Sequence, residues 1–306
     1  MSSNSHFSQR HPFIFGFSLM MLAMVLILGA MAAFHFWFLN DDTIDSRFSF
    51  GGDRIGVVHL RGFISGSRDV NDWIESLEQD DKIRGVVLRI DSPGGAVAPS
   101  QEMFSAVRRL AATKPVYVSM GSVAASGGYY VACGGTKLWA NRATLTGSIG
   151  VKAQLTDMQD LLSKIGIREQ TVTSGDLKNT GTVFRPMNEK ERSYMQGLVD
   201  DIHEQFVSDI AESRKMSRED LLPYADGRAM TGMQAHRAGL VDELGGFDDV
   251  VLALGRDLGM EPDFTLVEGP IKPKSLINRL AGVLELAENL LLLGNSFQST
   301  CTETLP

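Results

Sequence analysis

The chain has 306 residues, of which 43% are hydrophobic and 22% are charged, and its formal net charge at pH 7 is −8. This composition is typical of a folded globular protein rather than a disordered one, and the length suffices for one large domain with a substantial core. The acidic balance and the scattered lysines and arginines argue against a nucleic-acid partner, which would need a basic patch.

The N-terminal segment differs from the rest of the chain. Residues 13–34 carry no charge and residues 37–39 extend the apolar run, so we predict a transmembrane anchor over residues 13–39. A cleavable signal peptide is the alternative, because Ala30-Met31-Ala32 resembles a cleavage site. The uncut anchor is favoured because the apolar run is longer than the core of a signal peptide.

The charges that flank this span predict its orientation. Arg10 precedes it, and Asp41, Asp42 and Asp45 follow it. By the positive-inside rule, residues 1–12 then lie in the cytoplasm and the folded domain lies outside it. We therefore expect a single-pass protein of the cell membrane, with membrane lipid around its N-terminal helix and an extracytoplasmic domain.

After a polar linker (40–53), residues 54–270 are predicted to form an α/β domain. Apolar runs predict strands near 54–60, 83–91, 115–119, 137–141 and 168–173, and helical periodicity predicts helices near 69–79, 97–112 and 155–165. The alternation of strands and helices indicates an α/β fold. Periodicity alone leaves a doubly wound sheet open.

A long charged helix is predicted over residues 188–215. It carries apolar residues at helical spacing, which we expect to pack in the core: Tyr194, Leu198, Ile202, Phe206 and Ile210. At the C-terminus, residues 271–306 are expected to contain an amphipathic helix (276–293) and a mobile tail, because Arg279, Glu285 and Glu288 interrupt the apolar run.

One hydroxyl stands among small residues in the run Gly-Ser-Val-Ala-Ala-Ser-Gly-Gly-Tyr-Tyr (121–130). Ser126 follows a buried strand and precedes a helical segment, so it is predicted to occupy a strand-to-helix turn. The first amides of a helix have no internal partner, and the N–H of Gly127 can therefore point at a developing oxyanion. This pattern indicates a serine nucleophile. The alternative is a small-residue turn that lets a helix pack close to a sheet.

A second source of backbone amides ends the strand at 83–91. There the chain reads Ser92-Pro93-Gly94-Gly95, and its two glycines allow a positive φ and the close approach of a peptide. Their N–H groups are candidates to complete an oxyanion hole. An ordinary Pro-Gly turn is the alternative interpretation.

A serine nucleophile needs a base, and none of the histidines has a suitable context. Three lie in or beside the N-terminal apolar segment, and the other three are His59, His203 and His236. Lys178, in the loop Ser-Gly-Asp-Leu-Lys-Asn-Thr-Gly (174–181), is the best alternative. A lysine that is shielded from water can act as a base, because burial disfavours its charged form.

The two cysteines indicate neither a disulfide framework nor a metal site. Cys133 lies in the small-residue segment and Cys301 in the polar tail. We expect Cys133 to be a buried core residue. No metal and no cofactor is predicted.

Four segments together resemble the signal peptide peptidase A family of serine proteases: Asp91–Gly95, Ser122–Tyr130, Thr146–Gly150 and Ser174–Lys178. The resemblance covers roughly residues 54–255 and matches the short form with one catalytic unit. It implies that Ser126 is the nucleophile and Lys178 the general base. It also implies that Ser148 orients the lysine amine and that amides near Gly95 and Gly127 hold the oxyanion.

The same resemblance implies a crotonase-like superhelix of β-β-α units, as in the proteolytic subunit of Clp protease, and assembly into a homo-oligomer. The expected function is that of a membrane-anchored serine endopeptidase, which hydrolyses remnant signal peptides and other apolar peptides. Two alternatives remain open at this stage. One is a crotonase-like acyl-CoA enzyme, and the other is a catalytically idle membrane scaffold.

Overall fold

The computed structural model describes residue 21, residues 53–261 and residues 264–270. The chain divides into two compact units, residues 1–52 and 53–306, and the fold described below is that of the second unit. The expected anchor (13–39), apart from Met21, and the expected C-terminal helix and tail (271–306) lie outside the described residues. None of the described helices is both long and apolar enough to cross a membrane.

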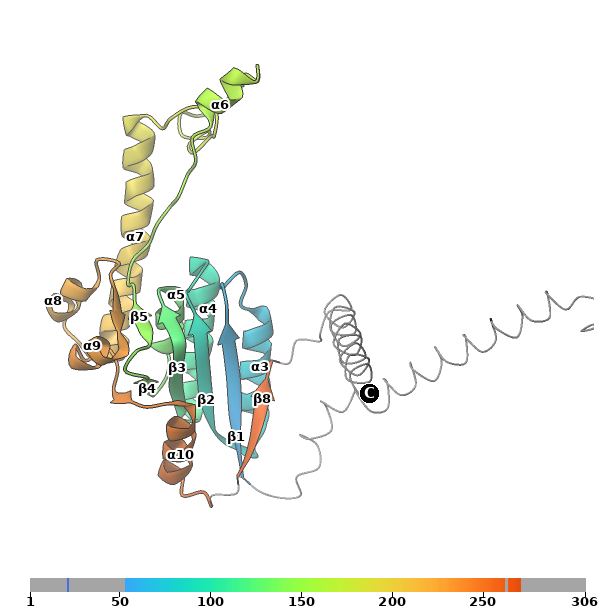
Figure 1. Ribbon diagram of the computed structural model, residues 1–306, viewed down its shortest axis with the longest axis vertical. Helices are drawn as coiled ribbons and strands as arrows, with labels where there is room; N and C mark the ends of the chain where they lie inside the picture. Colours follow the sequence, from blue (N-terminus) through green and yellow to red (C-terminus); the bar gives the residue numbers. More distant parts are fainter. Residues whose placement is uncertain (1–20, 22–52, 262–263, 271–306) are drawn as a thin grey trace, which may run out of the picture. The chain divides into compact units, whose positions relative to one another are not determined.

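A single eight-stranded sheet forms the centre of this unit (Figure 1). Its main path has the order β6-β5-β3-β2-β1-β8, while β4 pairs with β3 and with β7. The strands are β1 (Arg54–Arg61), β2 (Ile83–Ser92), β3 (Val116–Ala125), β4 (Lys137–Ala140), β5 (Leu145–Gly147), β6 (Ala229–Thr231), β7 (Glu243–Leu244) and β8 (Thr265–Gly269). All pairings are parallel except that of β5 with β6.

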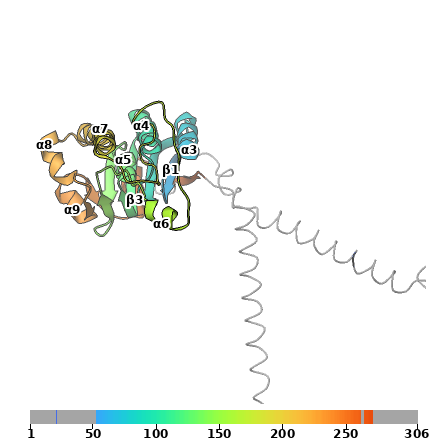
Figure 2. The same cartoon turned by 90° about the horizontal axis from the view of Figure 1, so that it is seen from above.

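Helices cover both faces of the sheet, which explains why its central strands are almost continuously apolar. The helices are α3 (Arg68–Gln79), α4 (Val97–Thr113), α5 (Gly127–Ala132), α6 (Gln159–Lys164), α7 (Glu189–Arg214), α8 (Arg218–Leu221), α9 (Gly232–Arg237) and α10 (Phe247–Asp257), with a short 3₁₀ helix η2 (Leu222–Tyr224). Viewed from above, α3, α4 and α7 lie on the same side of the sheet (Figure 2). This side holds the larger core, and α10 packs over a smaller core on the opposite face.

The central strands and helices agree with the sequence predictions. The strands expected near 54–60, 83–91, 115–119 and 137–141 are confirmed as β1 to β4, and the helices near 69–79 and 97–112 as α3 and α4. The strand expected at 168–173 is wrong. That segment is exposed and pairs with no strand in the part of the chain that the structure describes, and Val172 is fully exposed.

Residues 151–202, which we call the arm, leave the sheet after β5 and return along the first half of α7. Figure 1 shows α6 and this half of α7 projecting beyond the sheet. Tyr194 and Leu198 are 43% and 42% exposed, whereas Phe206 and Ile210 are buried in the larger core. The expectation that the whole apolar stripe of α7 packs in the core is therefore right only for its C-terminal half.

Candidate active site

Ser126 stands between the end of β3 and the first turn of α5, as the sequence predicts. Its backbone has φ 54° and ψ −121°, a conformation that residues with a side chain rarely adopt. Two hydrogen bonds hold it there: its N–H donates to the Gly147 carbonyl (2.8 Å), and its own carbonyl accepts from the Tyr130 N–H (2.9 Å). Backbone strain of this kind clusters at functional sites.

The glycine segment after β2 lies directly against this turn. Gly94 has φ 94°, and a Cβ on it would stand 2.6 Å from the Gly127 nitrogen and 3.0 Å from the Ser126 Cβ. A side chain at position 94 therefore cannot fit without displacing the serine turn. Gly94 and Gly127, which are 33 residues apart in the sequence, thus belong to one site.

The amides of Gly95 and Gly127 are adjacent at this site. Ile64 uses its N–H to bond the Gly94 carbonyl (2.9 Å) and its carbonyl to bond the Ala96 N–H (2.8 Å), so the N–H of Gly95 points away from Ile64. The Gly95 nitrogen lies 3.3 Å from where a Cβ on Gly127 would stand. Gly127 is the first residue of α5, and its N–H has no partner within the helix. Two such donors beside a hydroxyl can stabilise an oxyanion.

The backbone of Ser148 lies beside this site. Ser148 directly follows Gly147. Gly147 pairs with Ala125, and its carbonyl accepts the hydrogen bond from the Ser126 N–H. Ser148 has a positive φ of 51° and donates its N–H to the Arg228 carbonyl (2.8 Å). The structure therefore brings Ser126, Gly95, Gly127 and Ser148 together.

Lys178 is not brought to Ser126 within one copy of the chain. It is exposed on the arm, and its neighbour Asp176 forms an ion pair with Lys190 at the start of α7 (2.7 Å). Phe206, whose ring centroid lies 4.5 Å from that of Tyr130 beside the serine turn, is 16 residues further along α7 than Lys190. This corresponds to about 24 Å of helix.

Cys133 and two of the three histidine candidates are occupied elsewhere. The third, His203, lies on α7, and its buried Nε2 has no hydrogen-bond partner among the described residues. Burial raises the pKa of the Cys133 thiol to about 12, which keeps it neutral and confirms its expected place in the core. His59 Nε2 lies 2.8 Å from Glu268 Oε2, and His236 Nδ1 lies 3.2 Å from the Val241 carbonyl oxygen. These contacts hold both rings in structural positions.

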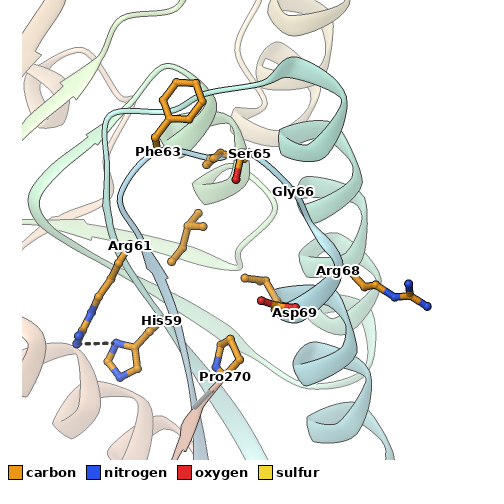
Figure 3. A pocket seen from close by; sticks show the side chains of 11 residues that line it. His59, Arg61, Phe63, Ser65, Gly66, Arg68, Asp69 and Pro270 are labelled. Atoms are coloured by element: carbon orange, nitrogen blue, oxygen red, sulfur yellow. Dashed lines mark hydrogen bonds between the residues drawn. The ribbon is translucent and has the colours of Figure 1, made fainter. Parts of the chain in front are cut away.

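His59 lines a pocket of about 490 Å³ next to the active-site loop (Figure 3). Its ring faces Arg61, whose Nη2 lies 3.4 Å from His59 Nδ1, and the exposed Phe63 lines the opposite end. Phe63 precedes Ile64, the residue that bridges to Gly95. The pocket is therefore adjacent to the segment after β2 that carries the Gly95 amide.

Two serines that shape the site escaped the sequence interpretation. The Ser92 hydroxyl donates to the Gly62 carbonyl (2.6 Å) and accepts from the Gly94 N–H (3.1 Å), which fixes the glycine turn. The Ser100 hydroxyl donates to the Ala96 carbonyl (2.8 Å) and would lie 2.4 Å from a Cβ on Gly127. The position of Ser92, two residues before a turn glycine, is a signal that would have identified its role.

Comparison with known proteins agrees with this geometry. A family model described as "Peptidase family S49" matches residues 108–261. A protease-named protein of Synechocystis sp. is 37% identical over 78% of this chain and 87% of its own length. The chain belongs to peptidase family S49. The resemblance to signal peptide peptidase A is confirmed by this membership together with a relative that itself carries the name SPPA.

Two further S49 relatives extend the comparison. A protease-named protein of Methanocaldococcus jannaschii is 34% identical over 67% of this chain and 71% of its own length. The chloroplastic serine protease SPPA of Arabidopsis thaliana is 32% identical over 76% of this chain and 37% of its own length. As an S49 peptidase, the chain is a protease with a mixed α/β sheet.

Proposed function

We propose that this S49 peptidase is a membrane-anchored serine endopeptidase that hydrolyses remnant signal peptides and other apolar peptides. The observation that carries the proposal is the convergence of the strained Ser126 turn with the amides of Gly95 and Gly127. The Ser126 hydroxyl would attack the scissile carbonyl, and the two amides would hold the resulting oxyanion. A general base would take the hydroxyl proton and return it to the leaving amine, which gives an acyl-enzyme. The base would then activate a water molecule that hydrolyses this acyl-enzyme.

The general base in this proposal is Lys178 of a second copy of the chain. Lys178 lies on the arm and away from its own Ser126, so a neighbouring copy is the source that completes the site. The exposed apolar side chains of the arm support such an assembly: Leu155, Leu161, Ile165, Tyr194 and Leu198. A closed ring of copies would cover this surface and would shield the lysine, which disfavours its charged form.

The membrane anchor, the orientation and the superhelical fold belong to the same proposal. Support for the anchor is the uncharged run over residues 13–34, and support for an extracytoplasmic domain is the charge difference across it. The branching of the sheet, in which β3 pairs with β4 and then with β5, supports a crotonase-like superhelix. A reporter that is active only outside the cytoplasm, fused after Pro306, should be active. A silent fusion would contradict the orientation.

The nucleophile is tested with a fluorophosphonate probe on the full chain, purified in detergent. We expect one adduct, which mass spectrometry maps to Ser126, and no adduct on the matched variant Ser126→Ala. An adduct elsewhere, or none, would overturn the serine mechanism. Tight binding of coenzyme A without labelling would instead favour an acyl-CoA enzyme.

A further inference from the structure

Strand β3 changes partners just before it reaches Ser126. Its first part pairs with β4 up to the register Met120 with Ala140, and its last part pairs with β5 from Val123 onward. On the β2 side the register jumps from Ile90–Met120 to Ser92–Ala124, so one residue of β2 faces three residues of β3. Such a bulge interrupts the hydrogen-bond ladder and leaves backbone groups to be paired in other ways. We call Gly121–Val123 the β3 bulge.

Side chains from three neighbouring positions take over these backbone groups. Asp91 accepts a hydrogen bond from the Val123 N–H (3.1 Å), and the Thr144 hydroxyl donates to the Gly121 carbonyl (2.7 Å). Just after the bulge, the Thr146 hydroxyl donates to the Ala124 carbonyl (2.6 Å). Thr144 and Thr146 are 2% and 0% exposed, so water cannot replace their hydroxyls.

The close fit of the β3 bulge explains the glycine at its start. A Cβ on Gly121 would lie 3.1 Å from the carboxylate of Asp91. The Thr144 hydroxyl also accepts from the Asn141 N–H (3.1 Å), which fixes its orientation. The β3 bulge is thus held on the β2 side by Asp91 and on the β5 side by Thr144.

We propose that Thr144 and Asp91 are positioning residues for the Ser126 nucleophile, an inference that rests on the proposed serine mechanism. Ser126 follows the β3 bulge by three residues, and its N–H bonds β5 at Gly147. The bulge determines where β3 leaves β4 and joins β5, and so where the serine turn stands relative to the amides of Gly95 and Gly127. Neither side chain takes part in the chemistry itself.

The test measures the rate of fluorophosphonate labelling of Ser126, together with kcat and KM for an apolar peptide, on the full chain in detergent. Thr144→Val keeps the shape of the side chain and removes its hydroxyl. We expect labelling and kcat to fall roughly tenfold to a hundredfold with KM changed less than about twofold, because a displacement of the order of 1 Å has such effects on catalysis. Thr144→Ser, which restores the hydroxyl, should restore both rates.

Thr136→Val is the matched control. The Thr136 hydroxyl accepts from the Val116 N–H (3.0 Å), so it also supports β3, but at the end far from Ser126. Its labelling rate should stay within about twofold of that of the wild type.

A second pair of variants tests Asp91. Asp91→Asn keeps an acceptor for the Val123 N–H and should be labelled at close to the wild-type rate, whereas the labelling rate of Asp91→Ala should fall roughly tenfold.

The outcomes separate this inference from the proposed function. If wild-type Ser126 is not labelled, the serine mechanism fails, and the positioning role fails with it. If the wild type is labelled, the positioning role alone is wrong in either of two cases. In the first, folded Thr144→Val is labelled as fast as the wild type. In the second, the labelling rate of Thr144→Val falls no further than that of Thr136→Val. If Thr144→Val does not fold, the Asp91 pair decides: equal labelling of Asp91→Ala and Asp91→Asn would overturn the inference.

Discussion

At the scale of single residues, the backbone conformation of Ser126 destabilises the folded state. A residue with a side chain at φ 54° and ψ −121° carries strain of about 1–3 kcal/mol, which glycine avoids. The hydrogen bonds to Gly147 and Tyr130 hold the chain in this conformation. The site therefore keeps a serine where glycine would be the more stable residue.

This strain gives a prediction for two variants that remove the Ser126 hydroxyl. Ser126→Ala keeps a Cβ and should keep the strain, whereas Ser126→Gly should relieve it. We expect Ser126→Gly to be more stable than Ser126→Ala by about 1 kcal/mol, in spite of the greater unfolded-state entropy of glycine. Urea unfolding of the two variants measures this difference. Equal stability would show that the turn is not strained.

Residue patterns predict most of the candidate site, and what they miss has physical causes. Ser126, Gly95 and Gly127 were predictable because small residues and turn glycines mark places where the backbone must come close, whereas Ser148 was expected only from the family resemblance. Thr144 was not, since a buried hydroxyl that bonds a distant carbonyl leaves no periodic pattern in the sequence. Its role depends on a register change between β3 and its neighbours, which appears only in the folded sheet.

At the scale of elements, the end of α7 is fixed to the sheet by a largely buried ion pair. Arg214 Nη2 lies 2.5 Å from Asp242 Oδ1, and Asp242 also accepts from the Leu138 N–H of β4 (2.7 Å). Burial disfavours the charged carboxylate, but the hydrogen bonds from Arg214 and Leu138 outweigh it, so the pKa of Asp242 is lowered. This contact holds the base of the helix that carries the arm.

We predict that Arg214→Met lowers the free energy of unfolding by about 2 kcal/mol, because it leaves a partly buried carboxylate without its partner. The control is Arg218→Met, which removes an exposed pair with Glu204 and should cost less than about 1 kcal/mol. Denaturant unfolding of both variants gives the comparison. Equal losses would contradict a special role for the pair at the end of α7.

The stability of the N-terminal end of α7 depends on pH. Two hydrogen bonds from Arg185 (2.8 and 2.6 Å) and one from the Asn188 N–H (3.0 Å) lower the pKa of Glu191 from 4.5 to about 2. Because the pKa of this carboxylate is lower in the folded state than in the unfolded state, ionised Glu191 stabilises the folded state above pH 4.5. This contribution is lost as the pH falls toward 2.

Hydrogen exchange of residues 185–195, corrected for intrinsic rates, should therefore show loss of protection between pH 4.5 and pH 2. In Glu191→Gln the protection should already be low at pH 5 and should change little with acid. Glu189→Gln, at an exposed position of the same turn, should behave like the wild type. A wild-type profile for Glu191→Gln would contradict this account.

Whole elements were predictable where the chain itself supplies the packing partner. The runs that became β1, β2 and β3 are apolar because helices cover both faces of the sheet. By contrast, the segment 168–173 has a strand-like composition but pairs with no strand among the described residues. The stripe at Tyr194 and Leu198 has a helical period, but no described part of the same chain covers it. Periodicity shows which face is apolar and not what lies against it.

At the scale of the whole molecule, the separation of Lys178 from its own Ser126 predicts complementation between copies. We expect Ser126→Ala and Lys178→Met to be inactive separately, and a mixture of the two, dissociated and reassembled at equal amounts, to recover about a quarter of wild-type activity. Lys190→Met, which changes another lysine of the arm, is the control and should remain active. A mixture that stays inactive, although it co-assembles, would contradict a base supplied by a neighbour.

The length of the arm has a consequence for when the protease can act. A solitary copy would hold a nucleophile without a base, so a newly made chain would be harmless to its surroundings until it meets others. Cleavage per copy would then rise with local density and fall on dilution, with no inhibitor or removable segment required. Helix α7 would thus serve as a spacer that keeps the two halves of the chemistry apart until copies assemble.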